Sequence, residues 1–336
     1  MATGSKVDVR RGEVARVDFG GCVLWGDDGF LLRATVRGRL MGPRKSLGNA
    51  VVVGDFVGYQ VVERTTRPGA MPESAFEEAV VVDVERRRNV FSRRAAGRVP
   101  VEQVMAANLD QVIVVASYAD PPFRHGFADR VLAQAERAGI AARLVLNKID
   151  LADDREGSAR AILEAYAAVG YATHAVCARA GEGVSELAGA CDGRRSLFVG
   201  HSGVGKSTLL NTMVPGLDLL VGQVNQKTGK GRHTTTAACL VRPAPGFELI
   251  DTPGMRAFGL WGISPRDLEE AYRELRPHRG ACRFGDCAHV QEPGCAVRAA
   301  VEAGEIPKAR YESFLKLRDE LAREVAAEAT RLKGTP

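Results

Sequence analysis

Short apolar runs alternate with polar positions between residue 8 and about residue 90, as in "VARVDF", "FLLRATVRGRL" and "AVVVGDFVGYQVV". Gly, Asp and Pro separate these runs, for example in "GDDG" and "RPGAMPES". Several short strands with closely spaced turn residues indicate a small closed barrel. The length suits a five-stranded oligonucleotide-binding (OB) barrel, although an SH3-like barrel would give a similar pattern. We assign residues 1–95 to this β-barrel domain.

The pattern changes between about residues 102 and 260, where strand-like and helical segments alternate. "DQVIVVAS" and "ARLVLN" are strand-like, whereas "DRVLAQAERAG" and "SARAILEAYAAVG" have helical periodicity. Alternation of this kind predicts a parallel, doubly wound α/β sheet. We assign residues 96–260 to this central domain.

Beyond residue 261 the pattern is mainly helical. Ser264 is a candidate N-cap, with Pro265 at the first helical position of "SPRDLEEAYRELR". A long amphipathic segment, "PKARYESFLKLRDELAREVAAEATRLK", follows later in the chain. We assign residues 261–336 to a C-terminal, mainly helical domain.

Composition is consistent with a multidomain soluble protein. The 336 residues suit two or three domains, and a hydrophobic content of 45% is enough for separate cores. The first residues lack the apolar region of a secretory signal, and no apolar run reaches the length of a membrane span. We expect a cytoplasmic protein that does not contact membranes. We also expect a monomer, because each domain can bury its own core.

Positive charge is concentrated in the first third of the chain. Residues 1–100 contain 17 basic and 12 acidic residues, and the remainder is neutral. This asymmetry indicates an RNA-like polyanionic partner for the barrel, although a basic surface that is merely solvated fits equally well. Six arginines surround Phe91 in residues 86–98. Phe91 could stack on a base while the arginines bind phosphates, or the segment could be a solvated linker.

A phosphate-binding loop follows the strand-like segment "SLFV". "GHSGVGKS" matches G-x4-G-K-[ST] and opens the helical segment "STLLNTMV", which is the context that this motif requires. We expect Lys206 to reach the β- and γ-phosphates and the Ser207 hydroxyl to bind Mg²⁺. The predicted nucleotide contacts are Gly200, His201, Ser202, Gly203, Val204, Gly205, Lys206, Ser207 and Thr208.

The segment "NKID" after the strand-like "RLVL" can read guanine. The Asp150 carboxylate can accept both N1–H and the 2-amine of guanine, and adenine lacks that pair of donors. Further along, "DTPG" can supply Asp251 for Mg²⁺ through water and the Gly254 N–H for the γ-phosphate. The sequence therefore predicts that the protein binds GTP with Mg²⁺. The predicted contacts to the base are Asn147, Lys148, Ile149 and Asp150.

The guanine-reading segment precedes the phosphate loop, which reverses the usual order. A parallel sheet can be cut at one loop and rejoined at its old termini without moving its strands. We therefore expect a circularly permuted P-loop GTPase domain. Motion of its nucleotide-sensing loops would then reach both flanking domains.

A cluster of metal-ligating residues lies in "CRFGDCAHVQEPGC". Three thiolates and one imidazole form a closed tetrahedral set that is typical of structural zinc. We expect one Zn²⁺ per chain, with buried free thiols as the alternative. The four other cysteines are expected to be buried thiols. The predicted ligands are Cys282, Cys287, His289 and Cys295.

The permuted order with these flanking domains resembles the RsgA (YjeQ) family of small ribosomal subunit biogenesis GTPases. The resemblance rests on "ANLDQVIVVAS", "NKID", "GHSGVGKST", "GRHTTT", "DTPG" and the cysteine spacing, and it covers nearly the whole chain. It implies a GTP hydrolase that binds the 30S subunit and its 16S rRNA late in maturation. It also implies that the subunit stimulates conversion of GTP to GDP and phosphate.

The sequence offers candidates for the residues that carry out hydrolysis. Met255 stands where Ras-like enzymes carry a water-orienting Gln, so we expect slow intrinsic turnover. His233 in "GRHTTT" can hydrogen-bond a water, and the resemblance points to the same residue, although a loop His without a role is the alternative. Thr235 is the preferred Mg²⁺ ligand, with Thr234 and Thr236 as alternates. Arg232 is a weaker candidate for neutralising transition-state charge.

Two other functions compete with this interpretation. One is a P-loop ATPase with an RNA-binding domain, which Asp150 disfavours. The other is a scaffold that binds zinc and RNA without catalysis, which Met255 leaves open. The combination of Lys206, Ser207, Asp251 and His233 favours the enzyme.

Overall fold

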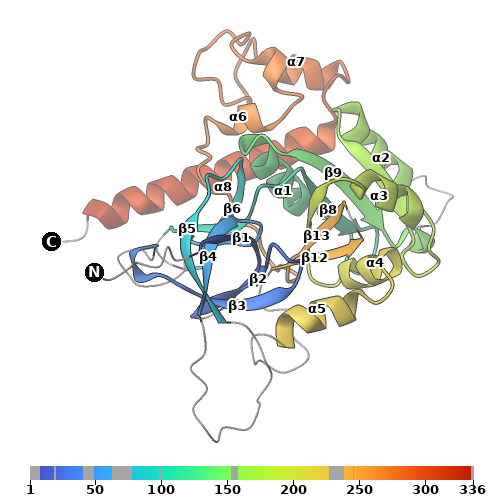
Figure 1. Ribbon diagram of the computed structural model, residues 1–336. Coiled ribbons are helices and arrows are strands. Elements are labelled where there is room, and N and C mark those ends of the chain that lie inside the picture. Colours follow the sequence, from blue (N-terminus) through green and yellow to red (C-terminus); the bar gives the residue numbers. More distant parts are fainter. Residues whose placement is uncertain are drawn as a thin grey trace, which may run out of the picture.

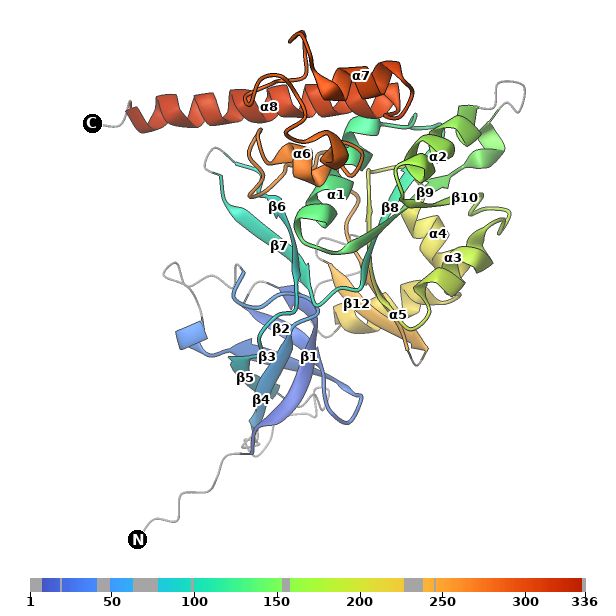
Figure 2. The same cartoon turned by 90° about the horizontal axis from the view of Figure 1, so that it is seen from above.

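A computed structural model shows three parts, a barrel, a central α/β domain and a C-terminal helical region (Figure 1). The turned view places the barrel and the long helix α8 at opposite ends, with the α1 side of the central domain against α8 (Figure 2). The structure describes residues 8–18, 20–40, 49–62, 78–97, 100–152, 158–226, 238–244 and 246–333.

The N-terminal part is a closed five-stranded barrel. β1 pairs with both β2 and β4, and β3 runs parallel to β5, which closes the order β1-β2-β3-β5-β4. This OB-like arrangement confirms the predicted barrel. Its interior is filled by alternate strand residues, among them Val14, Leu24, Leu32, Val57 and Tyr59. The elements are β1 (Arg10–Asp18), β2 (Gly21–Trp25), β3 (Leu31–Val36), the short helix η1 (Gly38–Leu40), β4 (Phe56–Val62) and β5 (Glu78–Val84).

A two-stranded hairpin, β6 (Val90–Arg94) and β7 (Glu102–Ala107), joins the barrel to the central domain. Phe91 on β6 is fully buried, and its ring centroid lies 5.7 Å from that of Phe258. Both interpretations of this segment were therefore wrong: it is neither a solvated linker nor a site where Phe91 stacks on a base. The error arose because the arginines dominate the local composition and hide the strand pattern.

The central sheet has the order β10-β9-β8-β11-β13-β12. All neighbours are parallel except β12, which is antiparallel to β13. Successive residues of β8 enter different cores, because Val112 and Val114 pack on one face and Ile113 and Val115 on the other. Burial of both faces explains why this strand is a continuous apolar run. The strands are β8 (Gln111–Ser117), β9 (Ala141–Asn147), β10 (Ala172–Val176), β11 (Arg195–Gly200), β12 (Cys239–Ala244) and β13 (Phe247–Asp251).

Helices cover both faces of the sheet (Figure 1). α1 and α2 contribute to one core, and α3, α4 and α5 contribute to the other. Together these layers form the predicted doubly wound domain. The helices are α1 (His125–Arg137), the short η2 (Ile149–Leu151), α2 (Ser158–Ala168), α3 (Val184–Cys191), α4 (Lys206–Met213) and α5 (Leu217–Gln226).

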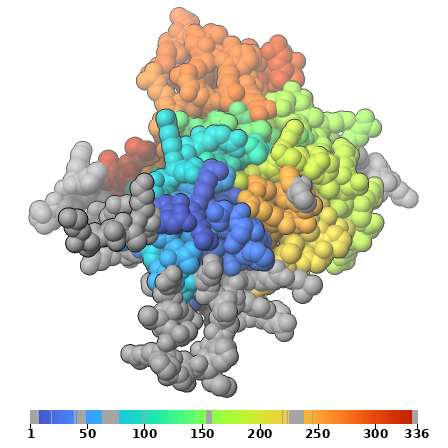
Figure 3. All heavy atoms as spheres, viewed as in Figure 1, coloured from blue at the N-terminus to red at the C-terminus, as the bar shows by residue number. Residues whose placement is uncertain are grey.

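The barrel and the sheet are continuous. Arg16 of β1 pairs with Cys239 of β12, which joins them into one sheet of eleven strands. On the face shown in Figure 3, the blue barrel lies directly against the orange strands. Glu13 is buried at this junction and forms ion pairs with Arg195 and Arg242, and both arginines also hold Glu248.

The C-terminal region packs α6 and α8 against α1 (Figure 2). Its first helix differs from the prediction, because Ser264 and Pro265 lie in a turn and α6 begins at Leu268 after Asp267. Ser264 still makes capping contacts, because its hydroxyl oxygen accepts from the Asp267 N–H at 3.2 Å and its own N–H donates to the Asp267 carboxylate at 3.3 Å. These bonds hold a turn, and the regular helix starts one residue after Asp267. No helix in the described ranges is long and apolar enough to span a membrane. The helices are α6 (Leu268–Ala271), η3 (Arg276–His278), α7 (Ala296–Glu302) and α8 (Lys308–Lys333).

Candidate nucleotide site and metal cluster

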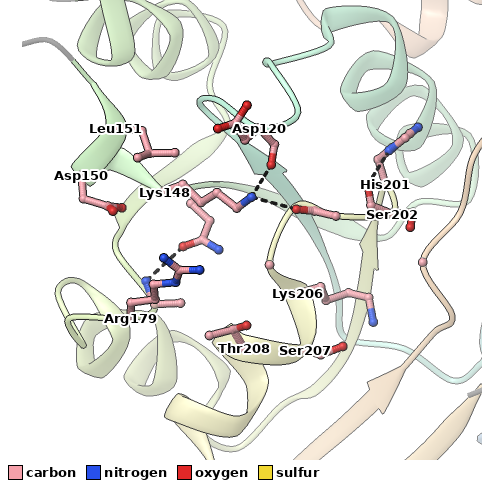
Figure 4. A pocket seen from close by; sticks show the side chains of 15 residues that line it. Asp120, Lys148, Asp150, Leu151, Arg179, His201, Ser202, Lys206, Ser207 and Thr208 are labelled. Atoms are coloured by element: carbon pink, nitrogen blue, oxygen red, sulfur yellow. Dashed lines mark hydrogen bonds between the residues drawn. The ribbon is translucent and has the colours of Figure 1, made fainter. Parts of the chain in front are cut away.

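A pocket of about 600 Å³ lies at the carboxyl ends of β8, β9 and β11 (Figure 4). Ligands bind at this edge in doubly wound sheets. The pocket brings together the phosphate loop and the guanine-reading segment, which are about fifty residues apart in the chain. Its lining is formed by Asp120, Asn147, Lys148, Asp150, Leu151, Ala178, Arg179, His201, Ser202, Gly203, Gly205, Lys206, Ser207, Thr208 and Gly254.

The phosphate loop runs from the end of β11 into α4. Gly203 and Gly205 have φ angles of +87° and +84°, a left-handed conformation that favours glycine. A Cβ atom on Gly205 would lie 2.5 Å from the Asn147 amide nitrogen, so the close approach also requires glycine. The turn presents backbone N–H groups and the start of α4, an arrangement suited to a phosphate group.

Lys206 and Asp251 form a buried ion pair beside this loop. Lys206 opens α4, and Asp251 ends β13, which is parallel to the strand leading into the loop. The position of a lysine and a carboxylate at one end of two parallel strands suits a nucleotide phosphate with its metal ion.

Asn147 and Lys148 attach the guanine-reading segment to the phosphate loop. The Asn147 side chain donates to the Val204 carbonyl at 3.0 Å and accepts from the Ala178 N–H at 3.1 Å. Lys148 Nζ donates to the carbonyls of Gly203, at 2.9 Å, and Asp120. These bonds hold the base-binding and phosphate-binding halves of the pocket at a fixed spacing.

Asp150 lies in η2 at the rim of the pocket and is exposed. The thiol of Cys177 donates to Asp150 Oδ1 at 3.2 Å. The carboxylate is therefore held from behind by the loop after β10 while its free side faces the pocket (Figure 4).

The four cysteine and histidine residues predicted as metal ligands lie together in space and form a candidate metal-binding cluster: Cys282, Cys287, His289 and Cys295. One ligand atom from each residue lies within 4.8 Å of all the others. His289 Nδ1 is 3.3 Å from the Cys295 sulfur and 3.6 Å from the Cys282 sulfur. Three thiols and an imidazole gathered this closely suit a tetrahedral ion.

Glu292 organises the loop that carries these ligands. Its carboxylate accepts hydrogen bonds from the backbone N–H groups of Ala288, Val290 and Gln291. Backbone N–H groups, its own first and that of Ala288 next, lower the pKa of Glu292 to about 2. The ionised side chain thus stabilises the turn between His289 and Cys295.

The profile of the family described as RsgA GTPase matches residues 84–261 of the chain, which is more than half of its length. The chain belongs to the RsgA GTPase family. The matched range contains both the guanine-reading segment and the phosphate loop. The protein is therefore a GTP hydrolase.

Relatives in the RsgA family extend over most of the chain. A small ribosomal subunit biogenesis GTPase RsgA from Chlorobaculum tepidum is 41% identical over 316 residues, which cover 93% of this chain and 98% of the relative. The protein of the same name from Gemmatimonas aurantiaca is 46% identical over 246 residues, which cover 73% of this chain and 79% of the relative.

Two solved structures share the fold. YjeQ from Thermotoga maritima aligns with a TM-score of 0.69 at 31% identity, covering 94% of this chain and 99% of that chain. YloQ, described as a circularly permuted GTPase, aligns with a TM-score of 0.66 at 22% identity and covers 96% and 99% of the two chains. The likeness to YloQ shows the fold alone, and it confirms the expected permutation.

Most of the predicted nucleotide contacts of this RsgA family member line the pocket. Ile149, Gly200, Val204 and Asp251 do not, and the last three are buried. The predicted loop residues His233 and Thr235, with Arg232, Thr234 and Thr236, lie outside the described residues. Two further lining residues, Asp120 and Leu151, were not among the contacts predicted from the sequence. The signal for Asp120 was its position just after β8, at the same sheet edge as the loop.

The side chains of Met255 and His201 pack against neighbouring residues of the protein. Met255 is buried in the core, and its backbone exchanges hydrogen bonds with Gly200 and Ser202. Its side chain therefore cannot orient a water. His201 contacts Arg124 at 3.3 Å and lies edge-on to Phe127, so its ring points toward α1 (Figure 4).

The other four cysteines are buried, as predicted. Burial raises the pKa of the Cys22 and Cys239 thiols to about 12. These two thiols are therefore protonated and unreactive at neutral pH.

Proposed function

We propose that this RsgA family member binds the 30S subunit through 16S rRNA and assists its late maturation. The subunit accelerates its hydrolysis of GTP to GDP and phosphate. One observation carries the proposal: Asp150 and the phosphate loop share a pocket in a permuted domain between an OB-like barrel and a Cys3His cluster. The relatives named above are small ribosomal subunit biogenesis GTPases.

In the proposed GTP complex, Lys206 leaves Asp251 for the β- and γ-phosphates. Asp251, the Ser207 hydroxyl and Thr235 are the residues that would hold Mg²⁺, which would neutralise charge on the phosphates. Gly254 donates to the γ-phosphate, and His233 orients the attacking water because Met255 cannot. The remaining predicted contacts, from residues 147–150 and 200–208, surround the base and the phosphates.

The barrel is the proposed rRNA-binding part. OB folds bind oligonucleotides on the face of strands 2 and 3. Arg33 on β3 and Arg37 just after it are exposed, as is Phe30 in the turn between β2 and β3. Phe30 is 73% exposed and replaces buried Phe91 as the candidate for stacking on a base.

The cluster of three cysteines and His289 is the proposed site of one structural Zn²⁺. We further propose domains at residues 1–95, 96–260 and 261–336, a monomer, and a cytoplasmic location. Each of these follows from the sequence pattern.

The decisive test is GTP and ATP hydrolysis by the purified protein, with and without 30S subunits at low salt. We expect slow GTP turnover that 30S subunits accelerate strongly, with ATP inert. Because phosphate contacts release counterions, the stimulation should weaken steeply as salt rises. An Asp150→Asn variant should no longer bind GTP and should bind xanthosine triphosphate instead, because the C2 carbonyl of xanthine accepts a hydrogen bond from the new amide.

GTP turnover that 30S subunits leave unchanged would refute the ribosomal partner and preserve the nucleotide chemistry. Equal hydrolysis of ATP would refute guanine recognition by Asp150. A His233→Ala variant that keeps full stimulated turnover would remove His233 from the mechanism.

A further inference from the structure

His289 presents its two ring nitrogens to different partners. Nδ1 faces the sulfur atoms of Cys295 and Cys282. Nε2 lies 3.0 Å from Oε1 of Glu269. The ring is buried, so Nε2 has no free access to solvent and depends on this carboxylate for its hydrogen bond.

Glu269 reaches the cluster from α6, a helix outside the ligand segment. Its neighbours Leu268 and Ala271 are buried in the core that also contains α1. The Glu269 side chain is 17% exposed, whereas that of the adjacent Glu270 is 56% exposed and pairs with Arg279 on the surface. Two consecutive glutamates therefore have different tasks, and only Glu269 faces the cluster.

We propose that Glu269 is the carboxylate that fixes the orientation and tautomer of His289. Its carboxylate accepts a hydrogen bond from Nε2–H, so the ring proton stays on Nε2 and the lone pair of Nδ1 is directed at the ion. The inference rests on the proposed zinc site and goes beyond it, because it assigns a positioning residue outside the cysteine-rich segment.

Two contacts from α8 complete the support of this histidine. The Tyr311 hydroxyl donates to the His289 carbonyl, and Arg318 donates to the Ala288 carbonyl at 3.0 Å. They hold the backbone, whereas Glu269 holds the ring. Because α6 and α8 both pack on α1, the ion is linked through Glu269 to the GTPase domain.

The test is zinc affinity of the full chain, measured by competition with a chromophoric chelator. Loss of a carboxylate behind a ligating histidine weakens metal binding about 10- to 100-fold. We expect that loss for Glu269→Ala and a smaller one for Glu269→Gln, whose amide oxygen still accepts from Nε2. Glu270→Ala is the matched control and should bind zinc as the wild type does.

Co²⁺ substitution gives a second readout that a loss of stability alone would not move. The visible spectrum of Co²⁺ should change in Glu269→Ala and stay near wild type in Glu270→Ala, because only the former frees the imidazole. Equal zinc affinity and equal spectra for the wild type and Glu269→Ala would overturn the inference. A wild-type chain that binds no zinc would instead refute the proposed metal site.

Discussion

Asp150 has two carboxylate oxygens, and one of them already accepts a hydrogen bond from the protein itself. The Cys177 thiol donates to Oδ1, and the loop carrying Cys177 is fixed by Thr212, which donates to the Ala178 carbonyl at 2.9 Å. Guanine needs both of its donors aligned with this carboxylate at once. A hydrogen bond from behind therefore restricts rotation of the side chain before the nucleotide arrives.

Replacement of Cys177 should show whether this thiol positions the Asp150 carboxylate or only fills space in the core. Cys177→Ala removes the donor, and we expect about tenfold weaker GDP binding, equivalent to about 1.4 kcal/mol. Inosine diphosphate lacks the 2-amine, so its affinity should fall less. Cys177→Ser keeps a donor and should restore binding. Titration of a fluorescent GDP analogue and competition with inosine diphosphate measure both affinities.

Cys191→Ala is the control, because that thiol is equally buried and lies away from the pocket lining. A variant at Cys177 that lowers the melting temperature but leaves both nucleotide affinities unchanged would contradict the assignment.

Glu292 should make the stability of the cluster loop depend on acid. Its folded pKa of about 2 is below the ordinary value of 4.5, so its ionised form favours the folded loop. That contribution is complete above about pH 4.5 and is lost as the pH falls toward 2. Glu292→Gln should therefore unfold at a lower temperature than the wild type at pH 7, with the difference shrinking below pH 4.5. A constant difference across this range would contradict the role.

The chemistry of single residues was predictable where a local motif carried it. Contacts between residues far apart in the chain could not be predicted from the sequence. The phosphate loop, the guanine reader and the Cys3His set are each defined within a few consecutive residues. The bond from Cys177 to Asp150 joins two segments across a helix and a strand, so spacing could not reveal it. Phe91 shows the reverse case, because its surroundings in sequence are basic while its surroundings in space are apolar.

At the scale of elements, a buried network of ion pairs around Arg310 fixes α8 to α1. Arg310 on α8 pairs with Asp129 on α1 and with Glu274, where Nε and Oε1 are 2.7 Å apart. The guanidinium also lies 4.4 Å from the centroid of the Tyr272 ring. All three charged groups are buried, so each depends on the others for compensation.

Arg310→Ala should destabilise the protein strongly. It leaves Asp129 and Glu274 buried without a cation, which costs about 3–5 kcal/mol of unfolding free energy. Arg130→Ala is the matched control, since Arg130 joins the same two helices through the partly exposed Glu320. We expect at most about 1 kcal/mol there. Denaturant unfolding measures the loss of unfolding free energy in each variant. Equal losses in the two variants would argue against the buried network as the main attachment of α8 to α1.

Strand and helix types were predictable where periodicity was strong, as in β8, α1 and α8. The helix expected from Ser264 was not, because a capping pattern specifies where a helix can start and not how far it continues. The segment instead breaks into a turn, α6 and η3, which lets Leu268 and Tyr272 enter the core.

At the scale of the whole molecule, the barrel and the hairpin are bonded to chain segments on either side of Asp251 and Gly254. β1 of the barrel pairs with β12, just ahead of β13 and Asp251. The Arg94 N–H of the hairpin donates to the Gly259 carbonyl, five residues after Gly254. The sequence predicted the permutation from motif order, whereas these attachments depend on tertiary contacts and could not be predicted.

Exchange of GDP for a non-hydrolysable GTP analogue should therefore change hydrogen exchange in β1 and β6. Rearrangement around Asp251 and Gly254 passes to these strands through their backbone hydrogen bonds. β5, which lies between β3 and β4, serves as the internal reference and should change less. Identical exchange of β1 and β6 in both nucleotide states would refute coupling to the flanks.

The reversed chain order also sets the order of events during translation. The barrel is complete once β5 has emerged, so it can fold at once. β8 must wait, because its neighbour β11 in the sheet is made much later. At about 5–20 residues per second, the nascent chain carries an apolar strand with an open edge for several seconds. The permutation therefore lets the barrel fold early in translation, whereas the central sheet is completed only after its later strands have been synthesised.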